Sequence, residues 1–107
     1  MQFQFNSDNQ ITGDQDTAQL AESIVRSRLG RLETRLTRIE LHVSDVNGPR
    51  GGQNDKRCLI EARPNGMDPI SATDQGETVE AAITGAADKL LTVFDRLVGR
   101  QTSRKGH

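Results

Sequence analysis

Two long stripes of apolar residues at helical spacing constrain most strongly how this chain can fold. One lies within residues 16–38 and the other within residues 78–98. In each, apolar residues recur every three or four positions, as on one face of an amphipathic helix. An amphipathic helix must bury its stripe against another element, so both predicted helices need an apolar surface to pack on.

Four short runs with strand-like patterns supply that surface. The clearest of them alternate apolar and polar residues, a pattern typical of half-buried strands. The runs occupy residues 1–5, 39–44, 56–63 and 69–73. The resulting order, β-α-β-β-β-α, predicts an α+β fold in which a single four-stranded sheet carries both helices on one face.

The chain has 107 residues, of which 33% are hydrophobic, enough for one domain with a thin aliphatic core. We expect that domain to span residues 1–100, with Gly99 ending the second helix and residues 101–107 forming a flexible tail. Cys58 is the single cysteine and has no disulfide partner within the chain, which indicates a reducing compartment. No apolar run approaches the roughly 20 residues needed to cross a bilayer. These features favour a cytoplasmic protein without membrane contact.

Positive charge is concentrated although the formal net charge is only -1. Arginines repeat with spacings of three, four and three along the first predicted helix, at positions Arg28, Arg31, Arg35 and Arg38. Lys89 and Arg96 share a stripe on the second. None of the six has an acidic residue three or four positions away, where a helical ion pair would form. If the helices lie side by side, they present a surface of unpaired positive charge. Alternatively, the arginine stems only cover core residues, or acids of other elements pair with them.

Phosphate is the natural ligand for such a surface, because the planar guanidinium group bridges phosphate oxygens. The partner would be a nucleic acid or an acidic protein. Phe3, Phe5 and Phe94 are the only aromatic residues, and all three fit core positions. Exposed aromatic platforms for stacking bases are therefore not expected. The sequence predicts recognition of the backbone and shape of folded RNA rather than of base sequence.

Catalytic and cofactor sites are not indicated. His42 alternates with core residues on a predicted strand, and together with His107 and Cys58 it forms no recognisable zinc set. The glycine-rich segment 47–55 lacks the spacing of a phosphate-binding loop. We therefore expect no enzymatic activity, no cofactor, no metal and no small-molecule substrate.

Two stretches resemble a known family, the ribosome hibernation promoting factors and ribosome-associated inhibitors. In VRSRLGRLETRLTRIE, the residues Arg28, Arg31, Leu32 and Glu33 fill the basic-x-x-basic-Leu-Glu pattern of the family's first helix. AAITGAADKL, residues 81–90, is similar to its second-helix signature Ala-Ala-Ile-x-Gly-x-x-Asp-Lys-Leu.

The resemblance implies the same fold and a non-enzymatic factor that binds the small ribosomal subunit and its rRNA in the mRNA and tRNA channel. Such factors block translation under stress or in stationary phase, and some promote ribosome dimers. The resemblance and the charge pattern together nominate six RNA-binding residues: Arg28, Arg31, Arg35, Arg38, Lys89 and Arg96. Thr92 and Val98 stand where family members usually carry basic residues, and no dimer-forming second domain follows. The expectation is a short, divergent member.

A different function remains open for the same fold. The arginines would then serve acidic partners or tertiary ion pairs in a protein-interaction or regulatory module that does not bind ribosomes. The second helix also has an apolar flank at Ala87, Leu91 and Val98. This flank predicts either a homodimer interface or a contact with the edge of the sheet.

Overall fold

The structure is a computed structural model that describes residues 1–7, 15–45 and 56–105. Its elements follow one another in the predicted order, with a short 3-10 helix, η1, added after the first α-helix. They are β1 (Gln2–Ser7), α1 (Gln15–Leu29), η1 (Gly30–Leu32), β2 (Leu36–Asp45), β3 (Lys56–Pro64), β4 (Ile70–Gly76) and α2 (Val79–Lys105).

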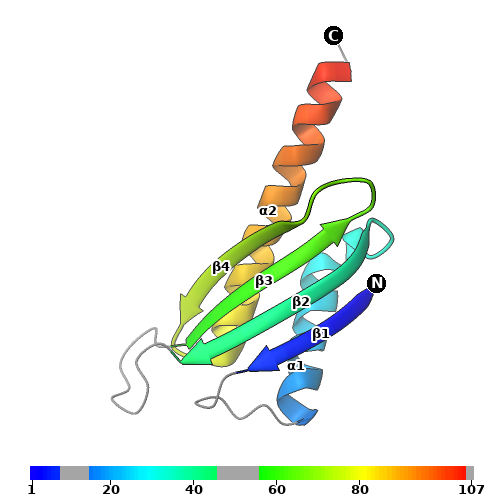
Figure 1. Ribbon diagram of the computed structural model, residues 1–107. Helices are drawn as coiled ribbons and strands as arrows, with labels where there is room; N and C mark the ends of the chain where they lie inside the picture. The colour runs from blue at the N-terminus through cyan, green and yellow to red at the C-terminus, as the bar shows by residue number, and fades with distance from the viewer. Residues whose placement is uncertain (8–14, 46–55, 106–107) are drawn as a thin grey trace.

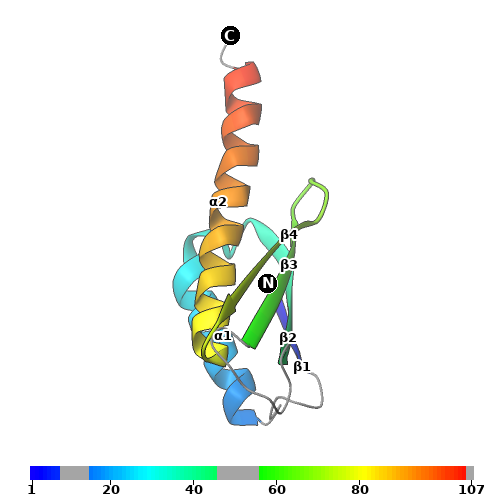
Figure 2. The same ribbon diagram turned by 90° about the vertical axis from the view of Figure 1, so that its left-hand side faces the viewer.

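The four strands form one sheet in the order β1-β2-β3-β4. β1 runs parallel to β2, with Phe3 opposite Ile39, and the other two pairings are antiparallel. Both helices cover the same face of this sheet, and the other face is left open (Figures 1 and 2). The predicted α+β class and the β-α-β-β-β-α order are confirmed.

The core lies between the sheet and the two helices. Alternation in β2 sends Ile39, Leu41 and Val43 towards the helices, where they are almost fully buried, because successive side chains of a strand point to opposite faces. The helices add Val25 and Leu29 from α1, and Ala82, Ile83, Ala86, Ala87, Leu90 and Phe94 from α2. Ala87, predicted as part of an outer apolar flank, is therefore a core residue.

The first predicted helix is too long. α1 ends at Leu29, and Gly30, a poor helix former, begins η1; a turn then leads into β2 at Leu36. The register between β2 and β3 shifts between Leu36 and Arg38, which sets Leu36 and Ile39 on the same buried side. The three-residue spacing of Leu36 and Ile39 therefore comes from an irregular strand. The same spacing is typical of a helix, which is why the sequence predicted one here.

The second helix does not end near Gly99. α2 continues to Lys105, with Gly99 inside it. Apart from its chain neighbours and the backbone of the helix, no described atom lies within 4 Å of where a Cβ of Gly99 would be. At about 1.5 Å per residue the helix is roughly 40 Å long, and its last turns project beyond the sheet (Figure 1). At the other end, the Thr78 hydroxyl accepts a 3.0 Å hydrogen bond from the Ala81 amide, an N-terminal cap.

A tight turn joins β3 to β4. Gly66 there has φ of 71°, a conformation that glycine adopts at least cost. The predicted glycine-rich loop 47–55 lies outside the described residues. No helix in the described part of the chain is both long and apolar enough to cross a membrane.

Candidate nucleic-acid interface

The structure distributes the six predicted cations over three places. Arg28 lies in the last turn of α1, Arg31 in η1 and Arg35 in the turn that precedes β2. All three reach residues of α2 across the seam between the helices. We call Arg28, Arg31 and Arg35, with the α2 residues that they contact, the seam cluster. Lys89 and Arg96 lie elsewhere on α2, and Arg38 lies on the sheet.

Two arginines of the seam cluster form ion pairs with α2. Arg31 Nη2 lies 2.8 Å from both carboxylate oxygens of Asp95 and donates a hydrogen bond there. Arg28 Nη1 lies 3.7 Å from Asp88 Oδ1, a distance that suits an ion pair but exceeds a hydrogen bond. Asp88 and Asp95 are seven residues apart, two helical turns, so α2 presents both carboxylates to the α1 side.

Arg35 uses an aromatic ring as its partner. Its Cζ atom lies 5.4 Å from the centroid of the Phe94 ring, within the range of a cation–π contact. Phe94 is only 2% exposed and belongs to the core, whereas Arg35 is exposed. The arginine therefore covers the ring and keeps a charged group at the surface.

Lys89 points to β4 on the other flank of α2. Its Nζ atom lies 3.1 Å from Asp74 Oδ1. Asp74 sits directly against Gly85: a Cβ atom on that glycine would lie 2.8 Å from the carboxyl carbon of Asp74. The glycine of the AAITGAADKL signature therefore makes room for the carboxylate that holds Lys89. Arg96 is exposed, and no described side chain forms an ion pair with it.

Gly85→Ala is expected to lower the free energy of unfolding by about 1 kcal/mol. Inserting a methyl group into filled space costs about 1–3 kcal/mol, but the helix preference of alanine offsets part of this cost, and the group that has to shift is the end of the Asp74 side chain. Asp74 would have to leave its position, and its contact with Lys89 would be lost. Chemical denaturation measures the change. Gly99→Ala is the matched control: it adds a methyl group in open space within the same helix and should leave stability unchanged or raise it by up to about 1 kcal/mol. Equal stability of the Gly85 variant and the wild type would contradict this packing.

Arg38 does not belong with the others. It lies on β2, on the face of the sheet turned away from the helices, and its guanidinium Nη2 donates a 2.6 Å hydrogen bond to Gln4 Oε1. It also approaches Glu40 Oε1 at 3.5 Å. The prediction that Arg38 continues the helical stripe is therefore wrong, because the chain at this position is a strand.

The prediction of unpaired cations also fails for four of the six residues. Arg38 has Glu40 on its own strand. Arg28, Arg31 and Lys89 have carboxylate partners, all of them distant in sequence. The side chains of these three cations are nevertheless 50–59% exposed. Ion pairs at that exposure contribute only about 0–1 kcal/mol each. A ligand with several phosphates could therefore replace the carboxylates at little cost in stability.

Asp74, Asp88 and Asp95 are the partners of the predicted cations that the sequence did not reveal. Asp88 and Asp95 are visible in the sequence as an acidic stripe on the second helix, but periodicity does not show that this stripe faces α1. Asp74 carried no signal beyond its polar place in a predicted strand region. The ion pairs of these aspartates with Arg28, Arg31 and Lys89 depend on how the helices and the sheet pack together, so only the structure reveals them.

Cys58 is buried on β3, opposite Asp74 of β4. Burial and the nearby charge of Asp74 raise the pKa of its thiol to about 12. The thiol therefore stays protonated at neutral pH and is a poor nucleophile.

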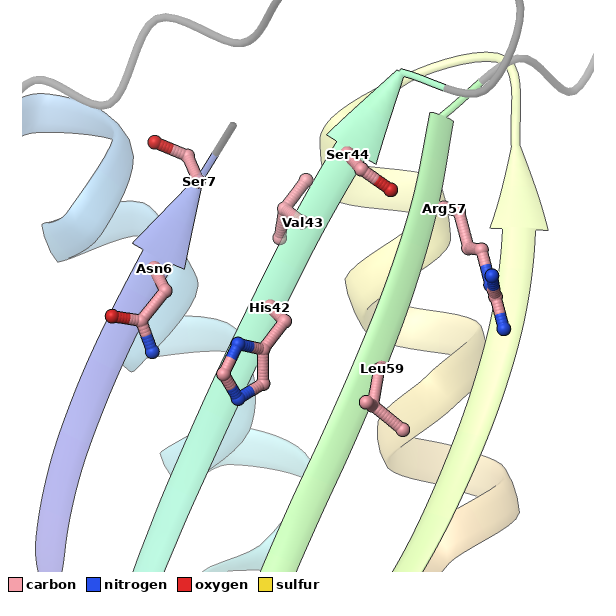
Figure 3. Close-up of a pocket in the computed structure, with 7 residues that line it drawn as sticks. All are labelled: Asn6, Ser7, His42, Val43, Ser44, Arg57 and Leu59. Carbon is pink, nitrogen blue, oxygen red and sulfur yellow. The ribbon is translucent and has the colours of Figure 1, made fainter. Parts of the chain in front are cut away.

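The open face of the sheet carries a shallow hollow of about 330 Å³ (Figure 3). His42 and Leu59 line it from β2 and β3, and Asn6 lines it from β1. This hollow lies on the face of the sheet turned away from the helices (Figure 3). The seam cluster lies between the helices, so the two surfaces are separate.

Comparison with known proteins gives one family and a set of similar folds. Residues 10–102 match the protein family described as Sigma 54 modulation protein / S30EA ribosomal protein. No curated protein matches the chain in a sequence search.

Two solved structures illustrate the shared fold. The N-terminal domain of Protein Y from Thermus thermophilus is 19% identical, with a TM-score of 0.71 over 91% of this chain and 99% of that domain. A ribosomal subunit interface protein from Coxiella burnetii is 14% identical, with a TM-score of 0.71 over 92% of this chain and 99% of that one.

Proposed function

This chain belongs to the Sigma 54 modulation protein / S30EA ribosomal protein family, and we propose that it is a ribosome-binding translation inhibitor of the hibernation type. In this proposal it has no enzymatic activity and acts in the cytoplasm, under stress or in stationary phase. It docks its helical surface on the rRNA of the small subunit. The family match over residues 10–102 is the observation that carries the ribosomal part of the proposal.

The seam cluster supports docking on RNA. Three arginines from α1, η1 and the following turn are gathered along one seam, exposed and at the molecular surface. Guanidinium groups can exchange a carboxylate for a phosphate without a change of geometry, since both ligands accept two parallel hydrogen bonds. Lys89 and Arg96 extend the cationic surface across α2. Arg38 would contact RNA only if a second RNA strand approached the open face of the sheet.

A specific observation favours a second candidate, a protein-interaction module of the same fold that does not bind ribosomes. Arg28, Arg31 and Lys89 are already satisfied by Asp88, Asp95 and Asp74. Three arginines and two aspartates in the seam leave a formal charge of only +1 there. Under this alternative the ion pairs tie the helices and the sheet together, and phosphate has no role.

Sedimentation with purified ribosomes at several salt concentrations separates the two candidates. About four to six phosphate contacts would give a slope of roughly -3 to -5 in a plot of log affinity against log salt. We expect the protein to pellet with isolated small subunits and with intact ribosomes at physiological salt, and to be released as salt rises.

Isolated large subunits serve as the control in the same gradients. Failure to pellet with small subunits at low salt would contradict the ribosomal proposal. Pelleting that is independent of salt would contradict the use of phosphate contacts while leaving ribosome association intact.

A further inference from the structure

The open face of the sheet carries a group of potential metal ligands that the proposed function does not use. Glu40 and His42 lie on β2 and Glu61 lies on β3, all directed away from the helices. Figure 3 shows the His42 ring standing on this face between β1 and β3. One donor atom from each residue falls within 4.8 Å of the other two.

The strand register brings two like charges face to face. Glu40 of β2 is the direct cross-strand partner of Glu61 of β3. Like charges in this position destabilise an antiparallel pair. Arg38 offsets part of the charge of Glu40 at 3.5 Å, whereas the partner that reaches Glu61 is the His42 imidazole. A bound cation between the two carboxylates would remove their repulsion.

The distances fit coordination better than direct hydrogen bonding. His42 Nε2 lies 3.5 Å from Glu40 Oε2 and 3.4 Å from Glu61 Oε1. A hydrogen bond between nitrogen and oxygen is usually about 2.7–3.2 Å long. In a tetrahedral zinc site with bonds of about 2.0–2.2 Å, neighbouring ligand atoms lie about 3.3–3.6 Å apart. The two nitrogen–oxygen separations fall within that interval, and all three ligand atoms lie within 4.8 Å of one another.

The first ligand residue is also held in place by its surroundings. Asn6 Nδ2 donates a 3.2 Å hydrogen bond to Glu40 Oε2 and a 3.3 Å hydrogen bond to the Leu41 carbonyl. Arg38 Nη2 contacts the other oxygen, Glu40 Oε1. Contacts of this kind orient a carboxylate before an ion arrives and raise the affinity of metal sites.

We propose that Glu40, His42 and Glu61 bind one divalent transition-metal ion of the zinc class. One imidazole nitrogen with two carboxylate oxygens suits zinc, whereas calcium and magnesium prefer oxygen ligands alone. Three protein ligands leave a fourth position for water. The ion joins β2 to β3 on the face opposite to the seam cluster.

The spacing of residues along the chain could not reveal this site, which is why the sequence analysis expected no metal. Glu40 and His42 are two residues apart on one strand, but Glu61 joins them only through the pairing of β2 with β3. The proposal does not depend on ribosome binding, and its failure would leave that function untouched.

Titration of the metal-free, EDTA-treated protein with zinc chloride, in competition with a chromophoric chelator, tests the proposal. We expect one ion per chain with a dissociation constant below about 100 µM and an increase in melting temperature on zinc addition. His42→Asn should weaken binding at least about tenfold, because loss of an orienting neighbour alone typically costs 10–100-fold. The same variant should lose the zinc-dependent increase in melting temperature.

His107→Asn is the matched control, since it removes the other histidine of the chain and should leave binding unchanged. Cobalt chloride gives a spectroscopic test: tetrahedral d–d bands without a thiolate charge-transfer band would support the imidazole–carboxylate set and exclude Cys58. The proposal is overturned if the wild type binds zinc more weakly than about 100 µM. It is equally overturned if His42→Asn binds as well as the wild type, or if His107→Asn abolishes binding.

Discussion

Reversing the charge of Arg28 and Arg31 together, Arg28→Glu and Arg31→Glu, is expected to abolish co-sedimentation with small ribosomal subunits at physiological salt. A hydrogen bond to a charged group contributes about 1.5–3 kcal/mol, so two lost contacts weaken binding at least about 100-fold. The new carboxylates also repel phosphate. Where residual binding at low salt can be measured, the salt slope should become less steep by about 2.

The double variant should still fold, because both ion pairs that it breaks are half exposed and contribute about 0–1 kcal/mol each. Circular dichroism and a thermal melt check this. Arg57→Glu with Arg63→Glu is the matched control, since it makes the same change in net charge on the open face of the sheet, where both residues are exposed. Retained pelleting of the seam variant would refute the assignment of Arg28 and Arg31. Equal loss in both variants would show that total charge matters and location does not.

Neutralising the acidic partners should have the opposite effect. Asp88→Asn with Asp95→Asn frees the two arginines and removes two negative charges from the surface that would meet phosphate. If each carboxylate opposes RNA binding by about 0.7 kcal/mol, within the range for exposed pairs, affinity for the small subunit rises about tenfold. The free energy of unfolding should fall by up to about 1 kcal/mol for each pair.

Asp68→Asn with Glu77→Gln is the matched control for this prediction. It also removes two exposed negative charges, but neither residue contacts the seam cluster. A tenfold gain confined to the Asp88 and Asp95 variant would identify these carboxylates as competitors of phosphate. Unchanged or weaker binding would instead favour the protein-interaction candidate, in which the ion pairs are part of the finished surface.

The fold was predictable because its signals are local and redundant. Alternation in β2 and the buried stripe of α2 each specify one element, and the need to bury both helices then leaves few arrangements. The end of α1 was not predictable in the same way. Leu32, Leu36 and Ile39 are all buried, but η1, a turn and an irregular strand give them the spacing that a continuous helix would also give.

The candidate site was predictable only in part. The sequence identified Arg28, Arg31 and Arg35 as exposed cations beside a core stripe, and the structure places them together in one seam. The sequence could not reveal how α2 is rotated about its axis. This rotation decides whether α2 turns Asp88 and Asp95 or instead Lys89 towards α1. That rotation depends on how Ile83, Leu90 and Phe94 pack in the core. Side-chain packing involves all the surrounding elements, so the sequence of α2 alone does not show it.

The parallel pairing of β1 with β2 has a consequence for biosynthesis. Parallel neighbours cannot be joined by a hairpin. β1 can therefore pair with β2 only after α1 and β2 have both been translated. The antiparallel meander from β2 to β4 needs only nearby segments, and contacts between nearby segments generally form faster. We therefore expect Phe3 and Phe5 of the nascent chain to lack their strand partner during early elongation. β1 is then synthesised before the other strands but is among the last to pair within the sheet.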